Sequence, residues 1–202
     1  MNTNHTPKHK NTYIIDIENA AETARLVDQD QVLNRLMGLF PVPLSALFGT
    51  PGKHRVLDLA CGPGGWALDV AFAHPELEVI GVDVARTMIR YAAARAQVQD
   101  RDNISFEELD ITQPFPFPDG SFSYIHARFL VGFLRPQQWV PLLRECRRLL
   151  APGGTLSLTE SEWAVTTSKA YETLKRRVSM ALWLANQSLS ADGQDLGVTP
   201  LL

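Results

Sequence analysis

The chain has 202 residues, of which 45% are hydrophobic and 20% charged, values typical of a soluble globular protein that forms one domain. Its formal net charge of −3 argues against nucleic-acid and membrane partners, which usually require a basic excess. The apolar runs are far shorter than the roughly 18–20 residues of a membrane span, and no signal-peptide core is present near the start. Cys61 and Cys146 match neither a disulfide framework nor a metal-site spacing, so we expect a cytoplasmic location and no metal.

Residues 1–53 are expected to form an N-terminal tail and a helical lid. The polar residues 1–12 are expected to be disordered, and the apolar residues of 17–40 recur at mostly helical spacing. Prolines at 41 and 43 would end this helix. We expect the lid, with Tyr13 and Phe40, to cover the functional site. Plain packing of the helix against the rest of the domain is the alternative.

Residues 54–202 alternate short apolar strands with helices. The predicted strands are 55–59, 77–82, 104–109, 122–126 and 155–159, and the predicted helices are 66–73, 87–98, 136–150 and 168–189. This order predicts an α/β fold with a doubly wound, mainly parallel sheet covered by helices on both faces. Ligands of such sheets bind at the carboxyl ends of the strands, near the switch in strand order. Residues that directly follow each strand are therefore the candidates for a binding site.

A glycine-rich loop follows the first predicted strand. Glycines at 62, 64 and 65 let the backbone turn sharply and approach a ligand closely, and the next helix offers free N–H groups to an anion. The loop satisfies the loose dinucleotide fingerprint G-x-G-x-x-G/A. The anion could be a pyrophosphate or a carboxylate. A tight strand-to-helix turn without a ligand is the alternative.

Acidic residues follow the second and third predicted strands. Asp83 could hydrogen-bond both ribose hydroxyls of an adenosine, as in NAD or S-adenosylmethionine; otherwise it would cap a helix. Asp110 could accept a hydrogen bond from the adenine amino group, and the backbone of Ile111 could meet a ring nitrogen. A turn started by Asp110 is the alternative.

Asp58 helps to separate the two cofactors. It lies within the first strand, four residues before Gly62, where its carboxylate suits a positively charged ligand. S-adenosylmethionine carries an ammonium and a sulfonium, whereas a dinucleotide would place a pyrophosphate there. About fifty residues also precede the first strand, while many dinucleotide-binding chains start close to it.

With these motifs the chain resembles the class I, Rossmann-like S-adenosylmethionine-dependent methyltransferases. The resemblance covers roughly residues 54 to 160, and it is carried by four segments in the family's order: VLDLACGPGGW (56–66), VIGVDVARTMIRYAAARA (79–96), FEELDITQPFPFPDGSFSYIHARFLVGFL (106–134) and LLRECRRLLAPGGTLSLTE (142–160). It is closest to the small-molecule branch that includes ubiquinone and menaquinone biosynthesis enzymes. The resemblance implies S-adenosylmethionine as cofactor and a small-molecule methyl acceptor.

The resemblance also implies roles for single residues. The methionine end of the cofactor would lie against Ala60, Gly62 and Gly64 with Asp58 beside them, the ribose against Asp83, and the adenine against Asp110 and Ile111, with Val84 and Met88 nearby. The chain departs from many relatives at Ala85, where a serine would cap the helix.

Methyl transfer by in-line displacement needs mainly alignment and a dry pocket, so we expect catalysis to be chiefly positional. The acceptor should approach near His126 and Arg128 after the fourth strand and near Glu160 and Trp163 after the fifth. His126 is the best candidate for a general base, although such a histidine is more often hydrogen-bonded packing. Arg128 could bind an anion, with a structural ion pair as the more common role.

Two other functions stay open at this point. An NAD-dependent oxidoreductase would place a pyrophosphate beside Asp58. The sequence also lacks an obvious hydride-transfer constellation such as Tyr-x-x-x-Lys. A non-catalytic methyltransferase-like module would use the same cofactor residues without turnover.

The C-terminal part is expected to be shortened. The family core usually has seven strands, of which five are visible, and the tail ends at Thr199-Pro200-Leu201-Leu202, a pattern typical of a helix start. The fifth strand would then be an exposed edge, and the protein a monomer or a homodimer.

Overall fold

The computed structural model describes residues 20–48 and 54–198. The predicted lid residue Tyr13, the turn at 50–52 and the C-terminal residues 199–202 lie outside these ranges. In chain order the elements are α1 (Ala20–Met37), α2 (Leu44–Phe48), β1 (His54–Leu59), α3 (Gly65–Ala73), β2 (Leu77–Asp83), α4 (Arg86–Val98), β3 (Ile104–Glu108), β4 (Phe122–Arg128), the 3-10 turn η1 (Leu130–Gly132), α5 (Pro136–Leu149), β5 (Leu150–Thr159) and α6 (Lys169–Leu184).

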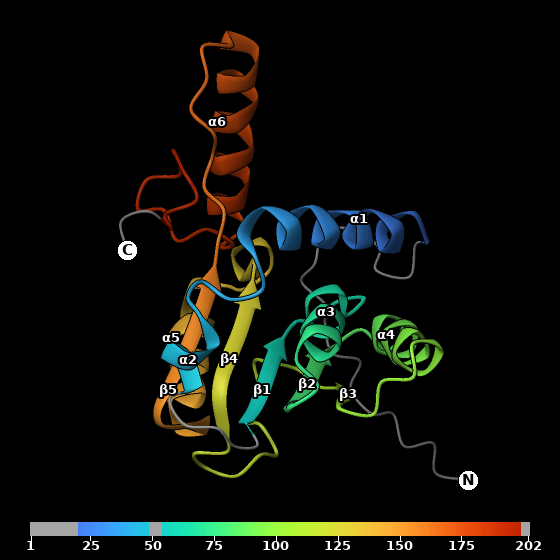
Figure 1. The fold of residues 1–202 in the computed structure, drawn as a ribbon. Coiled ribbons are helices and arrows are strands. Elements are labelled where there is room, and N and C mark those ends of the chain that lie inside the picture. Colours follow the sequence, from blue (N-terminus) through green and yellow to red (C-terminus); the bar gives the residue numbers. More distant parts are fainter. Residues whose placement is uncertain (1–19, 49–53, 199–202) are drawn as a thin grey trace, which may run out of the picture.

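The five strands form one parallel sheet in the order β3-β2-β1-β4-β5 (Figure 1). The predicted fold class is therefore confirmed. The chain runs outward from β1 through β2 to β3 and then returns to β4 on the other side of β1. This reversal opens a crevice at the carboxyl ends of β1 and β4, where doubly wound sheets bind ligands.

Two apolar clusters cover the two faces of the sheet. On one face, β1, β2 and β4 pack against α3 and the segment before β1, with Val56, Trp66, Val79 and Tyr124 fully or almost fully buried. The cluster on the other face joins alternate residues of the same strands to α5. Burial on both faces explains why the central strands β1, β2 and β4 are mostly apolar. Consecutive residues of β1 alternate between the faces, so Asp58 points to the side of α3, as Val56 does.

Some element ends differ from their predicted positions, for local reasons. The first helix ends at Met37, before the predicted Phe40, because Gly38 adopts a left-handed conformation with φ of 74°. Strand β5 starts at Leu150 instead of 155, so the Pro-Gly-Gly turn lies within the strand rather than before it. The register between β4 and β5 shifts between Phe122 and Tyr124, which accommodates this irregular start.

Strand β5 is the outer edge of the sheet on its side, and residues 161–198 contain no further strand. Helix α6 begins after Ser168, whose hydroxyl accepts a hydrogen bond from the backbone N–H of Tyr171, and it extends away from the sheet (Figure 1). The Glu162 carboxylate accepts hydrogen bonds from the N–H groups of Leu196 and Val198 and so holds the segment that follows α6. Among the described helices, none combines the length and apolar character that a membrane crossing requires.

Helix α1 turns a polar face toward the domain. Its one buried residue is Glu22, whereas Val32 and Leu36 are 56% and 76% exposed. Figure 1 shows α1 lying across the ends of the strands, over α3. The side chains beneath it are charged, which accounts for the polar inner face.

Candidate functional site

A cavity of about 240 Å³ lies beneath α1 at the carboxyl ends of the strands. Nine of the ten residues predicted for the site line it: Asp58, Ala60, Gly62, Asp83, Val84, Met88, Asp110, Ile111 and His126. The tenth, Gly64, is not among the lining residues. The remaining walls come, among others, from α1 (Arg25, Leu26, Gln29, Asp30) and from the region between the end of β4 and the start of α5 (Arg128, Phe129, Phe133, Gln138).

Gly62 and Gly64 have different structural roles in the loop. Gly62 has φ of 53°, and a Cβ added to it would meet nothing within 4 Å, so the backbone is open to a ligand there. Gly64 also has positive φ, but a Cβ added to it would collide with Ala92 and Phe106. Gly64 therefore lets α4 and β3 pack close to the loop. A direct contact of Gly64 with the cofactor stays a prediction.

Asp83 ties the glycine loop to the end of β2. Its Oδ2 accepts a hydrogen bond from the N–H of Gly62 at 2.9 Å, and its Oδ1 accepts one from the N–H of Ala85 at 2.8 Å. Burial raises the pKa of this carboxyl, against the lowering effect of the backbone donors. A carboxylate has about four acceptor positions, so these two bonds are compatible with the predicted ribose contacts. Asp83 also has the role of a helix cap, which was its predicted alternative. It accepts the N–H of Ala85 at the start of α4, where Ala85 itself has no side-chain acceptor.

Asp110 starts a turn, as its predicted alternative role required. Its Oδ1 accepts hydrogen bonds from the backbone N–H and the hydroxyl of Thr112, at 2.8 and 2.7 Å. It nevertheless lines the cavity, together with Ile111 and Met88. The sulfur of Met88 receives a long hydrogen bond from the Thr23 hydroxyl at 3.9 Å, so α1 reaches over this end of the cavity. The adenine-binding role of these residues stays a prediction.

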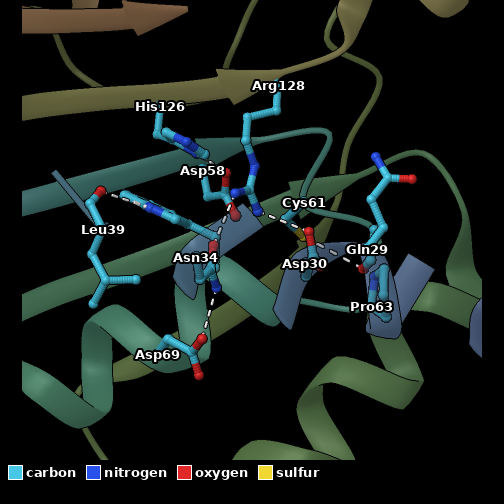
Figure 2. A network of polar contacts seen from close by, with 12 residues as sticks. Gln29, Asp30, Asn34, Leu39, Asp58, Cys61, Pro63, Asp69, His126 and Arg128 are labelled. Atoms are coloured by element: carbon cyan, nitrogen blue, oxygen red, sulfur yellow. Dashed lines mark hydrogen bonds and ion pairs between the residues drawn. The ribbon is translucent and has the colours of Figure 1, made fainter. Parts of the chain in front are cut away.

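A buried hydrogen bond joins neighbouring strands at the base of the cavity. The His126 Nδ1 lies 2.8 Å from Oδ1 of Asp58, and both residues are at most 5% exposed (Figure 2). The ring of Trp66 stacks on the imidazole with centroids 3.7 Å apart and planes inclined by 11°. Burial lowers the pKa of His126, against the raising effect of Asp58. A neutral imidazole that donates its Nδ1–H to the Asp58 carboxylate satisfies both groups.

Asp30 of α1 lies over the start of α3. Its carboxylate forms an ion pair with Arg128 at 2.7 Å (Figure 2). A Cβ added to Gly65 would collide with the Asp30 side chain. The N–H of Gly65 and the charge of Arg128 lower the pKa of Asp30, but burial outweighs them and raises it to about 6. Arg128 also donates to the Asn34 side chain at 2.8 Å, and Asn34 donates to Asp69. The structural role foreseen for Arg128 is therefore present.

Three other residues predicted near the site lie outside the cavity lining. Phe40 packs edge-on against Trp66 and Tyr124. It therefore has the packing role that was the predicted alternative to a lid. The Glu160 carboxylate accepts hydrogen bonds from the N–H groups of Leu130 and Val131, and Trp163 donates to Ser179. Burial raises the pKa of Glu160 to about 7.

Sequence reasoning missed several lining residues, above all Phe129. It has a left-handed backbone with φ of 59°, which is uncommon for an aromatic residue. The two backbone donors that bind Glu160 belong to the residues directly after it, so this carboxylate holds the turn. No local pattern in the sequence signals that conformation. The i,i+4 spacing of Asp30 and Asn34 was the available signal for the inner face of α1.

Comparison with known proteins places this geometry in a family. The family model described as "Methyltransferase domain" matches residues 56–154. The matched residues, which include most of the sheet, are therefore assigned to the methyltransferase domains. It is 27% identical over 190 residues to "Methyltransferase str2" of Strobilurus tenacellus, an alignment that covers 92% of this chain and 62% of the relative. It is 38% identical over 106 residues to a demethylmenaquinone methyltransferase of Thermus thermophilus, covering 52% of this chain and 46% of the relative.

A solved methyltransferase has the same fold. The crystal structure of a "SAM dependent methyltransferase" from Aquifex aeolicus superimposes with a TM-score of 0.56 at 20% identity, covering 85% of this chain and 88% of that one. At this identity the likeness concerns the fold alone. The chain spans less than two thirds of the length of either curated relative above.

The cavity carries more negative than positive groups. Four carboxyl side chains line it (Asp30, Asp58, Asp83 and Asp110) against two guanidinium groups (Arg25 and Arg128). Arg128 is paired with Asp30, and Arg25 with Glu22. The acids of β1, β2 and the segment after β3 therefore set the local field, which favours a ligand with positive charge.

Proposed function

We propose that the cavity binds S-adenosylmethionine and that this chain transfers its methyl group to a small-molecule acceptor. The observation that carries the proposal is the position of Asp30. Its carboxylate lies at the N-terminus of α3, where a dinucleotide-binding protein would hold a pyrophosphate. A pyrophosphate there would meet two carboxylates, Asp30 and Asp58. A ligand with an ammonium and a sulfonium meets a favourable field instead.

The lining residues fit this cofactor in chemistry as well as in charge. Gly62 offers open backbone beside Asp58, which suits an amino group, and Asp83 has acceptor capacity for ribose hydroxyls. Leu109, Ile111 and Met88 supply apolar walls for a planar base. When bound, the cofactor supplies a methyl group already activated by its positive sulfur.

The protein's own part in the reaction is to orient and to exclude water. Helix α1 covers the cavity through Leu26, Gln29 and Asp30, and Phe129 and Phe133 give the side beyond β4 an apolar surface. Holding reactants in line can contribute on the order of 7–11 kcal/mol. The lowered pKa of His126 favours its neutral form, which can donate an Nδ1–H to Asp58. Its role in this proposal is to hold the Asp58 carboxylate in place, so catalysis is chiefly positional.

The acceptor belongs to the same proposal. On the side of β4 the cavity is lined by Phe129, Phe133 and Gln138 and is uncharged apart from Arg128, which suits a neutral or planar organic molecule. One relative is a demethylmenaquinone methyltransferase, so quinols are the first class to test.

The predicted cytoplasmic location is supported by Cys61 and Cys146, which are unpaired and buried.

Two measurements test the proposal in turn. Titration calorimetry should give binding of S-adenosylhomocysteine and none of NAD. Transfer of a radiolabelled methyl group should then be assayed over phenols, naphthoquinols, amines and carboxylic acids. Binding of NAD in place of S-adenosylhomocysteine would refute the cofactor. Binding of S-adenosylhomocysteine with no transfer to any acceptor would favour the non-catalytic module instead.

A further inference from the structure

Phe129 is held in an uncommon backbone conformation at the wall of the cavity that it lines. Its φ of 59° and ψ of 32° are left-handed, a region that disfavours any residue with a Cβ and that aromatic residues seldom occupy. Strain of this kind persists only where the surrounding structure imposes it, and it is concentrated at functional sites. The contacts that impose it on Phe129 therefore indicate what the turn after β4 is built for.

The end of β5 supplies those contacts. The N–H of Phe129 donates to the backbone oxygen of Thr159 at 2.8 Å. The next two N–H groups, of Leu130 and Val131, donate to the two carboxylate oxygens of Glu160 at 2.9 and 3.1 Å. Leu130 and Val131 are buried, so water does not readily replace the carboxylate, and bonds to a charged acceptor are stronger than bonds to a neutral one. Glu160 thus fixes the backbone directly after the strained residue.

The same turn carries a second aromatic residue of the cavity. It continues as η1, and the N–H of Phe133 donates to the backbone oxygen of Leu130 at 3.1 Å. Phe129 and Phe133 both line the cavity, whereas Glu160 does not. The carboxylate of Glu160 can therefore act on a ligand in the cavity only through the turn that it holds.

We propose that Glu160 is a positioning residue for the methyl acceptor, which holds the turn 129–133 so that its two phenylalanines form the surface for a planar aromatic acceptor. The inference rests on the proposed function, because it assumes that a methyl acceptor enters the cavity on the side of β4. Among the described residues that line this side, the one charged group is Arg128, and it is paired with Asp30. Aromatic contact rather than charge would then select the acceptor. Without the carboxylate, Phe129 would relax to a more common backbone conformation and its ring would leave the cavity wall.

The test measures binding of a probe acceptor, 1-naphthol, to the full chain saturated with S-adenosylhomocysteine, which has no methyl group to transfer. Calorimetry is done with the parent protein, Glu160→Ala, Glu160→Gln and Glu162→Gln. Glu162 is the matched control, because its carboxylate also accepts two backbone N–H groups, those of Leu196 and Val198, at 3.1 and 3.3 Å. These two residues share an apolar cluster with Val131, but they do not line the cavity.

Glu160→Ala should weaken binding of 1-naphthol by about tenfold and leave the affinity for S-adenosylhomocysteine unchanged. Glu160→Gln keeps one acceptor oxygen, so its loss should be smaller, about threefold. Glu162→Gln should lower the thermal unfolding midpoint without changing the affinity for 1-naphthol. Phe129→Gly adopts the left-handed conformation without help but lacks the ring, so it should lose at least as much affinity for 1-naphthol as Glu160→Ala.

The remaining outcomes separate the inference from the proposed function. If the parent protein does not bind S-adenosylhomocysteine, the proposed function itself fails. If the parent binds S-adenosylhomocysteine but not 1-naphthol, the aromatic surface is overturned while the cofactor stands. Parent-like affinity for 1-naphthol in Glu160→Ala, or an equal loss in Glu162→Gln, overturns the positioning role. Loss of S-adenosylhomocysteine binding in both Glu160 variants also overturns it, because the carboxylate would then support the fold as a whole.

Discussion

The carboxylate of Asp58 and the imidazole of His126 are hydrogen-bonded across the strands β1 and β4, at register positions directly opposite each other. Both are buried, so neither can exchange its partner for water without moving. The pair fixes the direction of the Asp58 carboxylate at the cavity.

This pairing predicts that His126 affects cofactor binding before chemistry. His126→Phe keeps a ring against Trp66 but removes the donor to Asp58, and S-adenosylhomocysteine binding should weaken by about 1–3 kcal/mol. His126→Asn can keep a donor near the Nδ1 position and should lose less. Calorimetry of both variants gives the comparison. If both variants bind normally while methyl transfer stops, His126 acts as a base instead.

A second prediction concerns the ribose side of the cavity. Asp83→Ala should weaken binding of S-adenosylhomocysteine by roughly 1.5–3 kcal/mol, the range for hydrogen bonds to a charged group. Because Asp83 also binds the N–H groups of Gly62 and Ala85, the thermal unfolding midpoint should fall as well. Asp83→Asn keeps one acceptor oxygen and should lie between. Parent-like affinity in Asp83→Ala would remove the ribose assignment.

The close contact between Gly65 and the Asp30 side chain leads to a prediction about how α1 is held in place. In Gly65→Ala the new methyl group would occupy the space of the Asp30 side chain, so the ion pair with Arg128 must shift. Overpacking of this kind should lower the free energy of unfolding by about 1–3 kcal/mol and speed amide hydrogen exchange in α1. Gly132→Ala is the control, because an added Cβ there meets nothing within 4 Å. Equal exchange in α1 for both variants would argue against the contact.

The pH dependence of stability tests the hydrogen bonds by which Glu160 holds the turn after β4. Burial raises the pKa of Glu160 from 4.5 to about 7, so the folded state binds a proton more tightly than the unfolded state. The contribution of Glu160 to the free energy of unfolding should fall as pH rises from about 4.5 to about 7, and stay constant above. Thermal unfolding at pH 5 and pH 8 should show a smaller change in Glu160→Gln than in the parent. The same change in both proteins would contradict the assignment.

The strands, the glycine loop and the acids at strand ends could be predicted because each has a local signal. Asp83 and Asp110 follow apolar runs, and parallel strands bring their carboxyl ends to one edge. The partner of Arg128 could not be found in this way, since Asp30 lies 98 residues earlier in the chain. The periodicity of α1 identified a helix but not its inner face, because Val32 and Leu36 are exposed. Which face packs inward depends on the charged cavity beneath, and the apolar pattern of α1 does not encode that; the polar spacing of Asp30 and Asn34 was the signal available.

The polar inner face of α1 has a consequence for how the protein opens. Among the residues of α1, only Glu22 is buried, so releasing the helix would expose little apolar surface. Heat-capacity change and urea sensitivity both scale with newly exposed surface, so both should be small for this motion. Ionic strength would act instead on the ion pair of Asp30 with Arg128, whose charges this motion would expose to water. Opening would then depend on salt while it depends little on denaturant.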